Sequence, residues 1–138
     1  MKIADDFDAH MEKARQVFET ANILQTDKIR MFSFYHEGDN EWTESERAEV
    51  LARLRSMIAY AEEQDVVLLH ENEKDIYGDN EIRCLEIYKT FQGKIKGIFD
   101  PSNFIQCGVD ILPAYDLLKD YIDYFHVKDC LYEGGQVR

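Results

Sequence analysis

Short apolar runs recur along this chain at intervals of about thirty residues, the length of one βα unit, and this spacing constrains the fold more than any other feature. Each run is too short for a helix and rich in β-branched or aromatic residues, which is typical of a buried strand. The stretches between the runs are long enough for a helix. The alternation therefore predicts parallel strands joined by crossover helices in one α/β domain. The runs lie at 29–35, 66–71, 95–100 and 124–128.

Within the intervening stretches, apolar residues return every three or four positions, which is the period of a helix with one buried face. Thr43 and Glu46 form a capping box that begins the second of these helices. The tail from Leu131 contains two adjacent glycines and is predicted to be loop. The helices are predicted over about 5–25, 43–63, 82–91 and 110–120.

The charge and composition of the chain indicate which binding partners and which cellular compartment to expect. A formal net charge of −12 repels a phosphate backbone, so we expect no nucleic acid partner. No window approaches the ~20 consecutive apolar residues of a membrane span, and no secretory signal opens the chain. The three cysteines, Cys84, Cys107 and Cys130, are dispersed without metal or redox spacing. Such a set is typical of reduced thiols, which predicts a cytoplasmic protein.

Polar side chains stand where three of the apolar runs end. Glu71 closes the second run, Asp100 closes the third, and His126 lies within the fourth. Side chains at the carboxyl ends of neighbouring parallel strands meet on one face, where ligands bind in such folds. Two carboxylates and an imidazole suit Mn²⁺, Mg²⁺, Co²⁺ or Zn²⁺ and leave coordination positions for substrate or water. These residues therefore predict a divalent-metal site.

Each member of this set also has a simpler structural explanation. Glu71 could end its strand in solvent, and Asp100 could open a turn because it precedes a proline. His126 could be a hydrogen-bonded histidine inside a buried strand. The neighbouring His70 is expected to face away from Glu71, toward the helix layer, because side chains alternate along a strand.

Further polar side chains follow the same strand ends. Lys128 could neutralise a phosphate or a developing oxyanion. Asp129 could orient the His126 ring or bind a substrate hydroxyl. Asn103 could reach back toward the same space. All three could equally be turn, cap or solvated loop residues, and the residues alone leave both explanations open.

Four segments in order resemble the sugar phosphate isomerase/epimerase family, the xylose isomerase-like TIM barrels, a group that also includes endonuclease-IV-like enzymes. The resemblance covers most of the chain, and the ordered set is more specific than any single segment. The segments are residues 29–35 (IRMFSFY), 70–73 (HENE), 99–103 (FDPSN) and 125–129 (FHVKD).

The resemblance implies a (β/α)8 barrel that holds a divalent cation and acts on a small sugar or sugar phosphate. By this resemblance Glu71, Asp100 and His126 match the metal ligands of the family. Glu71 also matches one acid/base of a metal-assisted proton transfer next to a carbonyl. Asn103, Lys128 and Asp129 fall where such enzymes contact their substrates.

The chain departs from the family in length. A full barrel takes about 250 residues, and residues 1–138 match only units four to seven. The fourth metal ligand of the family, a Glu on the eighth strand, matches no residue here, so turnover is left open. Four parallel strands leave two open sheet edges, and we therefore expect a homodimer or a higher homo-oligomer.

Two other functions are weighed against the isomerase/epimerase hypothesis. A metal-dependent phosphodiesterase of the endonuclease-IV type would need more ligands than the sequence offers, and the negative charge disfavours it. A non-catalytic half-barrel that serves binding or assembly would show scattered positions for Glu71, Asp100 and His126.

Overall fold

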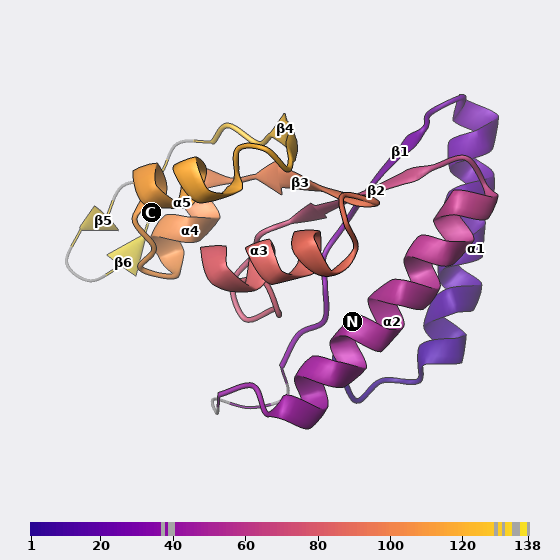
Figure 1. The fold of residues 1–138 in the computed structure, drawn as a ribbon, viewed down its shortest axis with the longest axis horizontal. Helices are drawn as coiled ribbons and strands as arrows, with labels where there is room; N and C mark the ends of the chain where they lie inside the picture. The colour runs from indigo at the N-terminus through magenta and orange to yellow at the C-terminus, as the bar shows by residue number, and fades with distance from the viewer. Residues whose placement is uncertain (37, 39–40, 129, 131, 134–135, 138) are drawn as a thin grey trace.

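The computed structural model describes residues 1–36, 38, 41–128, 130, 132–133 and 136–137. Its main sheet contains four parallel strands in the order β1-β2-β3-β4. Each connection between neighbouring strands passes through helix (Figure 1). The fold is α/β, with four parallel strands that alternate with helices, which confirms the prediction from the sequence. The strands are β1 (Lys28–Met31), β2 (Val67–Glu71), β3 (Ile95–Phe99) and β4 (Ile122–Phe125).

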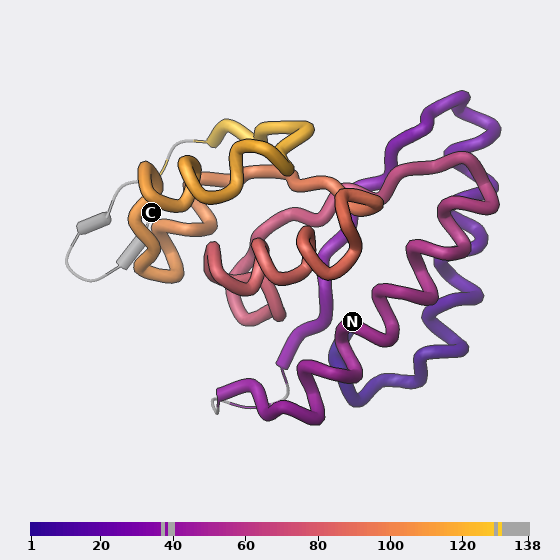
Figure 2. The backbone as a smooth tube through the Cα atoms, in the orientation of Figure 1, coloured from indigo at the N-terminus to yellow at the C-terminus, as the bar shows by residue number. Residues whose placement is uncertain are grey.

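Helices cover one face of this sheet. The first helix packs on β1, the second on β2 and the third on β3. The first two helices lie side by side at one end of the molecule, and the others gather at the opposite end (Figures 1 and 2). No helix in the described part of the chain is long and apolar enough to cross a membrane. The helices are α1 (Phe7–Leu24), α2 (Glu44–Glu63), α3 (Glu81–Thr90), α4 (Pro101–Gln106) and α5 (Ile111–Leu118).

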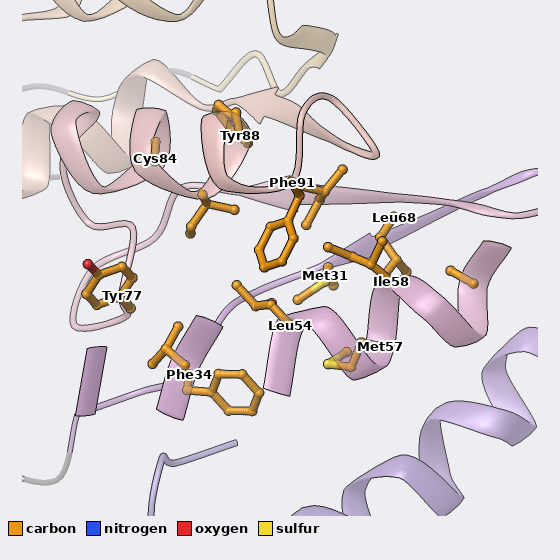
Figure 3. Packing of buried hydrophobic residues seen from close by; sticks show 14 of the residues in the cluster. Met31, Phe34, Leu54, Met57, Ile58, Leu68, Tyr77, Cys84, Tyr88 and Phe91 are labelled. Carbon is orange, nitrogen blue, oxygen red and sulfur yellow. The ribbon is translucent and has the colours of Figure 1, made fainter. Parts of the chain in front are cut away.

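The hydrophobic core lies between the sheet and these helices. Leu54, Met57 and Ile58 of α2 are buried with Met31 of β1 and Leu68 of β2 in one cluster (Figure 3). Burial of each such side chain contributes about 1.5–3 kcal/mol relative to exposure in water. The packing fixes the helix layer against β1 and β2 and so holds the carboxyl ends of the strands in place.

Side-chain caps explain where two of the helices begin. The predicted capping box of α2 is present: Thr43 Oγ1 accepts a hydrogen bond from the Glu46 N–H at 3.2 Å, and Glu46 Oε2 accepts one from the Thr43 N–H at 2.9 Å. Asn80 caps α3 by accepting a hydrogen bond from the Arg83 N–H at 3.0 Å. These bonds satisfy N–H groups that the helix itself leaves unpaired.

Helix α4 is absent from the sequence prediction. Its N-cap is Asp100, whose side chain accepts a hydrogen bond from the Asn103 N–H, and Pro101 occupies the first turn. An aspartate followed by a proline favours a turn but equally favours a helix start, because proline needs no N–H partner there. With only six residues, α4 is too short for a visible helical period.

Three strand assignments differ from the prediction. Strand β4 ends at Phe125, so His126 and Lys128 follow the strand and do not lie within it. Strand β1 ends at Met31, whereas Tyr35 forms only isolated bridges to Lys2 and Ile76. The tail was predicted to be loop, which is wrong, because β5 (Tyr132–Glu133) and β6 (Gln136–Val137) pair antiparallel.

The face of the sheet opposite the helices carries charged side chains. Lys28 Nζ of β1 lies 2.6 Å from Asp123 Oδ2 of β4, although β1 and β4 are the two outer strands. An ion pair between outer strands requires a sheet that curls toward this face, as in a barrel. The irregular register at Gly97 and Ile98, where β3 meets β4, adds to this curvature.

Candidate metal centre

Three adjacent strands deliver the three predicted ligands to one place. Glu71 is the last residue of β2, Asp100 directly follows β3, and His126 directly follows β4. One ligand atom from each residue lies within 4.8 Å of the others. The His126 N–H donates to the Phe99 carbonyl oxygen at 3.1 Å, which extends the β3–β4 pairing by one bond and fixes the backbone of His126.

Glu71 is 1 % exposed, which excludes the explanation that it ends its strand in solvent. Both carboxylate oxygens are engaged. Oε2 accepts a hydrogen bond from Arg30 Nε, and Oε1 lies 2.9 Å from His126 Nδ1. A buried carboxylate is costly unless a partner compensates its charge. Arg30, Glu71 and His126 therefore form one hydrogen-bonded group on the face of the sheet opposite the helices.

Asp100 is fully buried and divides its two oxygens between two tasks. Oδ1 accepts a hydrogen bond from the Asn103 N–H at 3.0 Å and caps α4. Oδ2 is buried and accepts no hydrogen bond, although Lys128 Nζ lies 3.0 Å away. The ammonium group of Lys128 therefore compensates the charge of this buried carboxylate. One of the two Asp100 oxygens belongs to the group of three candidate ligand atoms.

The donor set fits a divalent cation. Two carboxylates that lie this close repel one another when both are ionised. Here Arg30 beside Glu71 and Lys128 beside Asp100 offset their charge, and a divalent cation would do so directly. Two carboxylate oxygens and an imidazole nitrogen suit Mn²⁺, Mg²⁺, Co²⁺ or Zn²⁺. Three protein ligands leave room for a substrate to coordinate.

The predicted substrate-binding residues have different surroundings. Lys128 is half-exposed and donates a hydrogen bond from Nζ to Asn103 Oδ1 at 2.6 Å. Asn103 is 1 % exposed, and its Nδ2 donates to the Asn72 carbonyl oxygen at 2.8 Å. Asp129 lies outside the described residues. Of the two described side chains, Lys128 reaches solvent beside the ligands, whereas Asn103 is buried.

Two charged residues that lie beside the candidate ligands were not predicted from the sequence. Arg30 of β1 and Glu73, which follows β2, line the same open pocket as the three candidate ligands. Strand alternation could have placed Arg30 on the inner face, because its apolar neighbours Ile29 and Met31 face the hydrophobic core. Glu73 lies beyond the end of β2, where side chains no longer alternate between the two faces of the sheet. The sequence therefore does not indicate which way its side chain points. A larger hollow lies between the loops after β1 and β2, away from the ligands.

His70 faces the helix layer, as predicted. Its ring stacks edge-on against Tyr88 of α3, with ring centroids 6.1 Å apart. Neither ring nitrogen has a hydrogen-bond partner among the described residues. Burial lowers the pKa of His70 to about 4. The ring is therefore neutral at pH 7 and takes no part in the candidate centre.

Comparison with solved structures confirms the predicted fold, a partial TIM barrel, because xylose isomerase-like TIM barrel proteins share it. A xylose isomerase-like TIM barrel protein from Mycobacterium smegmatis, solved in complex with magnesium, has a TM-score of 0.72 and 12 % identity. That match covers 89 % of this chain and 46 % of the other. A D-tagatose 3-epimerase-like protein matches with a TM-score of 0.65 and 19 % identity, over 83 % of this chain and 46 % of the other.

The similarity extends to a particular enzyme of Bacillus anthracis. Its 3-dehydroshikimate dehydratase is 24 % identical over 130 residues, which are 94 % of this chain and 46 % of the relative. The crystal structure of the probable 3-DHS dehydratase AsbF from the same organism has a TM-score of 0.82 and 24 % identity, over 94 % of this chain and 47 % of the other. No protein-family model matches the chain. The chain spans about half the length of the relatives it matches.

Proposed function

We propose that this chain holds a divalent cation between Glu71, Asp100 and His126 and serves metal-assisted proton transfer next to a carbonyl. The substrate class is a small polyhydroxylated carbonyl compound, such as a sugar or a sugar phosphate. The observation that carries the proposal is the convergence of the three ligand atoms within 4.8 Å, with the side chains of Glu71 and Asp100 both buried.

The roles of the side chains follow from their positions. The cation, when bound, would polarise the carbonyl and hydroxyl oxygens of the substrate. Glu71 would take a proton from the carbon next to the carbonyl and return it, with Arg30 stabilising the carboxylate. Lys128, held by Asn103, would bind an oxyanion or phosphate of the substrate, and Asp129 is proposed to contact a substrate hydroxyl.

This chemistry also accommodates the named activities of the similar proteins. Epimerisation, isomerisation and dehydration next to a carbonyl can all begin with removal of a proton from the neighbouring carbon. The 3-dehydroshikimate dehydratase and the D-tagatose 3-epimerase-like protein fit this shared first step. The proposal is therefore stated at the level of that step. A phosphodiesterase remains disfavoured by the net charge of −12.

Glu71→Gln is expected to lower the affinity for Mn²⁺ at least about a hundredfold, because loss of an outer partner of a metal ligand already costs about 10–100-fold. Isothermal titration calorimetry of the purified protein with MnCl₂ measures this. Glu86→Gln is the matched control, because Glu86 is a partly buried carboxylate paired with Arg47 away from the site. Mn²⁺ affinity that is equal in wild type and Glu71→Gln would refute the proposed centre.

We also propose that a second copy covers the open edges of the sheet. Strands β1 and β4 have no outer neighbour in the described part of the chain. On the β4 side, Tyr124, Phe125 and Val127 are 54 %, 47 % and 91 % exposed. Apolar side chains along an open strand edge favour pairing with another chain.

Light scattering after size exclusion is expected to give twice the 16.2 kDa of the chain. Val127→Asp is expected to shift the protein to monomer, because it places a charge on the exposed edge. Ile82→Asp is the control, since Ile82 of α3 is also an exposed apolar residue, 62 % exposed, and lies away from both sheet edges. A wild-type protein that is monomeric at all concentrations would exclude pairing of two copies.

A further inference from the structure

The side-chain amide of Asn72 forms two reciprocal hydrogen bonds with the backbone of Asp100. Nδ2 donates to the Asp100 carbonyl oxygen at 2.9 Å, and Oδ1 accepts from the Asp100 N–H at 2.8 Å. Asn72 is 2 % exposed, so water does not compete for these bonds. Asn72 directly follows Glu71, and one amide therefore joins the two strand ends that carry the candidate carboxylate ligands.

These bonds continue the sheet beyond the point where the strands stop. The pairing of β2 with β3 ends at Glu71 and Ile98, and Asp100 lies past the end of β3. Its buried backbone N–H and carbonyl groups need partners, because an unpaired buried peptide group is costly. The Asn72 side chain supplies the partner of the N–H group and, as a neighbouring strand would, the shorter of two hydrogen bonds to the carbonyl oxygen, which also accepts from the Phe104 N–H at 3.3 Å.

A third residue closes the arrangement into a ring. Asn103 of α4 donates from Nδ2 to the Asn72 carbonyl oxygen at 2.8 Å, and its backbone N–H donates to Asp100 Oδ1 at 3.0 Å. The Asn72 side chain thus bonds to the Asp100 backbone, the Asp100 side chain caps α4, and the side chain of Asn103 in α4 bonds back to the Asn72 carbonyl oxygen. All three residues are buried, and a buried hydrogen-bond network of this kind rigidifies the groups within it.

We propose that Asn72 is the positioning residue of the metal centre, which clamps the backbone of Asp100 so that its carboxylate is held beside Glu71 and His126. The inference rests on the proposed function, because it assumes that these three residues bind a cation. Both polar atoms of the Asn72 amide are used by the Asp100 backbone, so Asn72 acts through Asp100 and is not itself a ligand.

Asn72→Leu removes both hydrogen bonds and keeps the size of the side chain. We expect its affinity for Co²⁺ to fall about 10–100-fold, as is typical when a residue that orients a ligand is lost. The visible absorption spectrum of bound Co²⁺ is expected to change as well, since it reports coordination geometry. Asn72→Ser, whose hydroxyl retains some hydrogen-bonding capacity, is expected to fall between the two proteins and serves the test if the leucine variant does not fold.

Asn80→Ala is the matched control, because Asn80 makes a comparable side-chain bond to the backbone as the cap of α3. This variant is expected to lose stability while its Co²⁺ affinity and spectrum stay those of wild type. A folded Asn72 variant with wild-type affinity and spectrum would overturn the inference. Glu71→Gln is titrated with Co²⁺ in parallel, and retained affinity in that variant would show instead that the centre itself is wrong.

Discussion

Replacement of Gly78 by alanine is expected to destabilise the fold by about 4 kcal/mol, a large part of the ~5–15 kcal/mol that stabilises a typical domain. Gly78 has a φ of +134°. A residue with a side chain adopts this backbone conformation only with strain of about 1–3 kcal/mol. The added Cβ would also lie 2.6 Å from Cε1 and 2.9 Å from Nε2 of His70. The ring is fully buried and cannot retreat, so overpacking adds about 1–3 kcal/mol.

Chemical denaturation of wild type and Gly78→Ala measures the loss, and Gly108→Ala separates its two causes. Gly108 has a φ of +73° with no atom within 4 Å of the added Cβ, so its substitution carries backbone strain alone, about 1 kcal/mol. The steric part is also expected to shrink in a Gly78→Ala/His70→Ala double variant, because the clashing ring is then gone. Equal losses at Gly78 and Gly108 would contradict the clash.

The stability of the protein is expected to fall by about 3 kcal/mol through His70 alone as the pH is lowered from about 6.5 to about 4. Burial lowers the pKa of His70 to about 4 in the folded protein, from 6.5 in the unfolded chain. Between these values the unfolded chain binds a proton that the folded protein excludes, so acid favours unfolding. Above about pH 6.5 neither state holds the proton, and this contribution is constant. The magnitude follows from about 1.4 kcal/mol for each unit of pKa difference.

His70→Leu isolates this effect from the other groups that titrate in acid, including His10, whose pKa is also lowered, mainly by burial. Leucine has a similar volume and no unpaired polar atoms, so we expect stability at pH 7 to be unchanged or higher. Urea denaturation at pH 7 and pH 4.5 provides the comparison. The stability lost between these two pH values should be smaller in the variant, and a parallel pH dependence in both proteins would contradict the assignment.

The periodic spacing of apolar residues predicted the longer elements of the fold, because many residues contribute to each of these patterns. The strands and the long helices follow from apolar spacing, and α2 also carries a local start signal in Thr43 and Glu46. The missed elements are short. Helix α4 and the β5–β6 pair depend on single capping or turn residues, and such residues favour more than one local structure.

The candidate site was predicted in part, because strand ends can be located but side-chain partners cannot. The convergence of Glu71, Asp100 and His126 follows from three strands that end at one face. The partners Arg30 and Lys128 approach the carboxylates from β1 and from the chain after β4. The curvature of the sheet determines whether these side chains come close enough to pair with the carboxylates. The clamp by Asn72 depends on a loop conformation, which no spacing rule encodes.

The short side chain of Asp100 must meet two demands: it caps α4, and it brings a negative charge to the candidate centre. Serine, threonine and asparagine begin helices well but bring no negative charge, whereas glutamate is charged but is not a favoured N-cap. Aspartate alone among the common residues meets both demands. Asp100→Asn would preserve the start of α4 and delete only the charge, while Asp100→Ala would delete both. The difference between these two substitutions therefore separates the contribution of helix initiation from that of the carboxylate charge at a single residue.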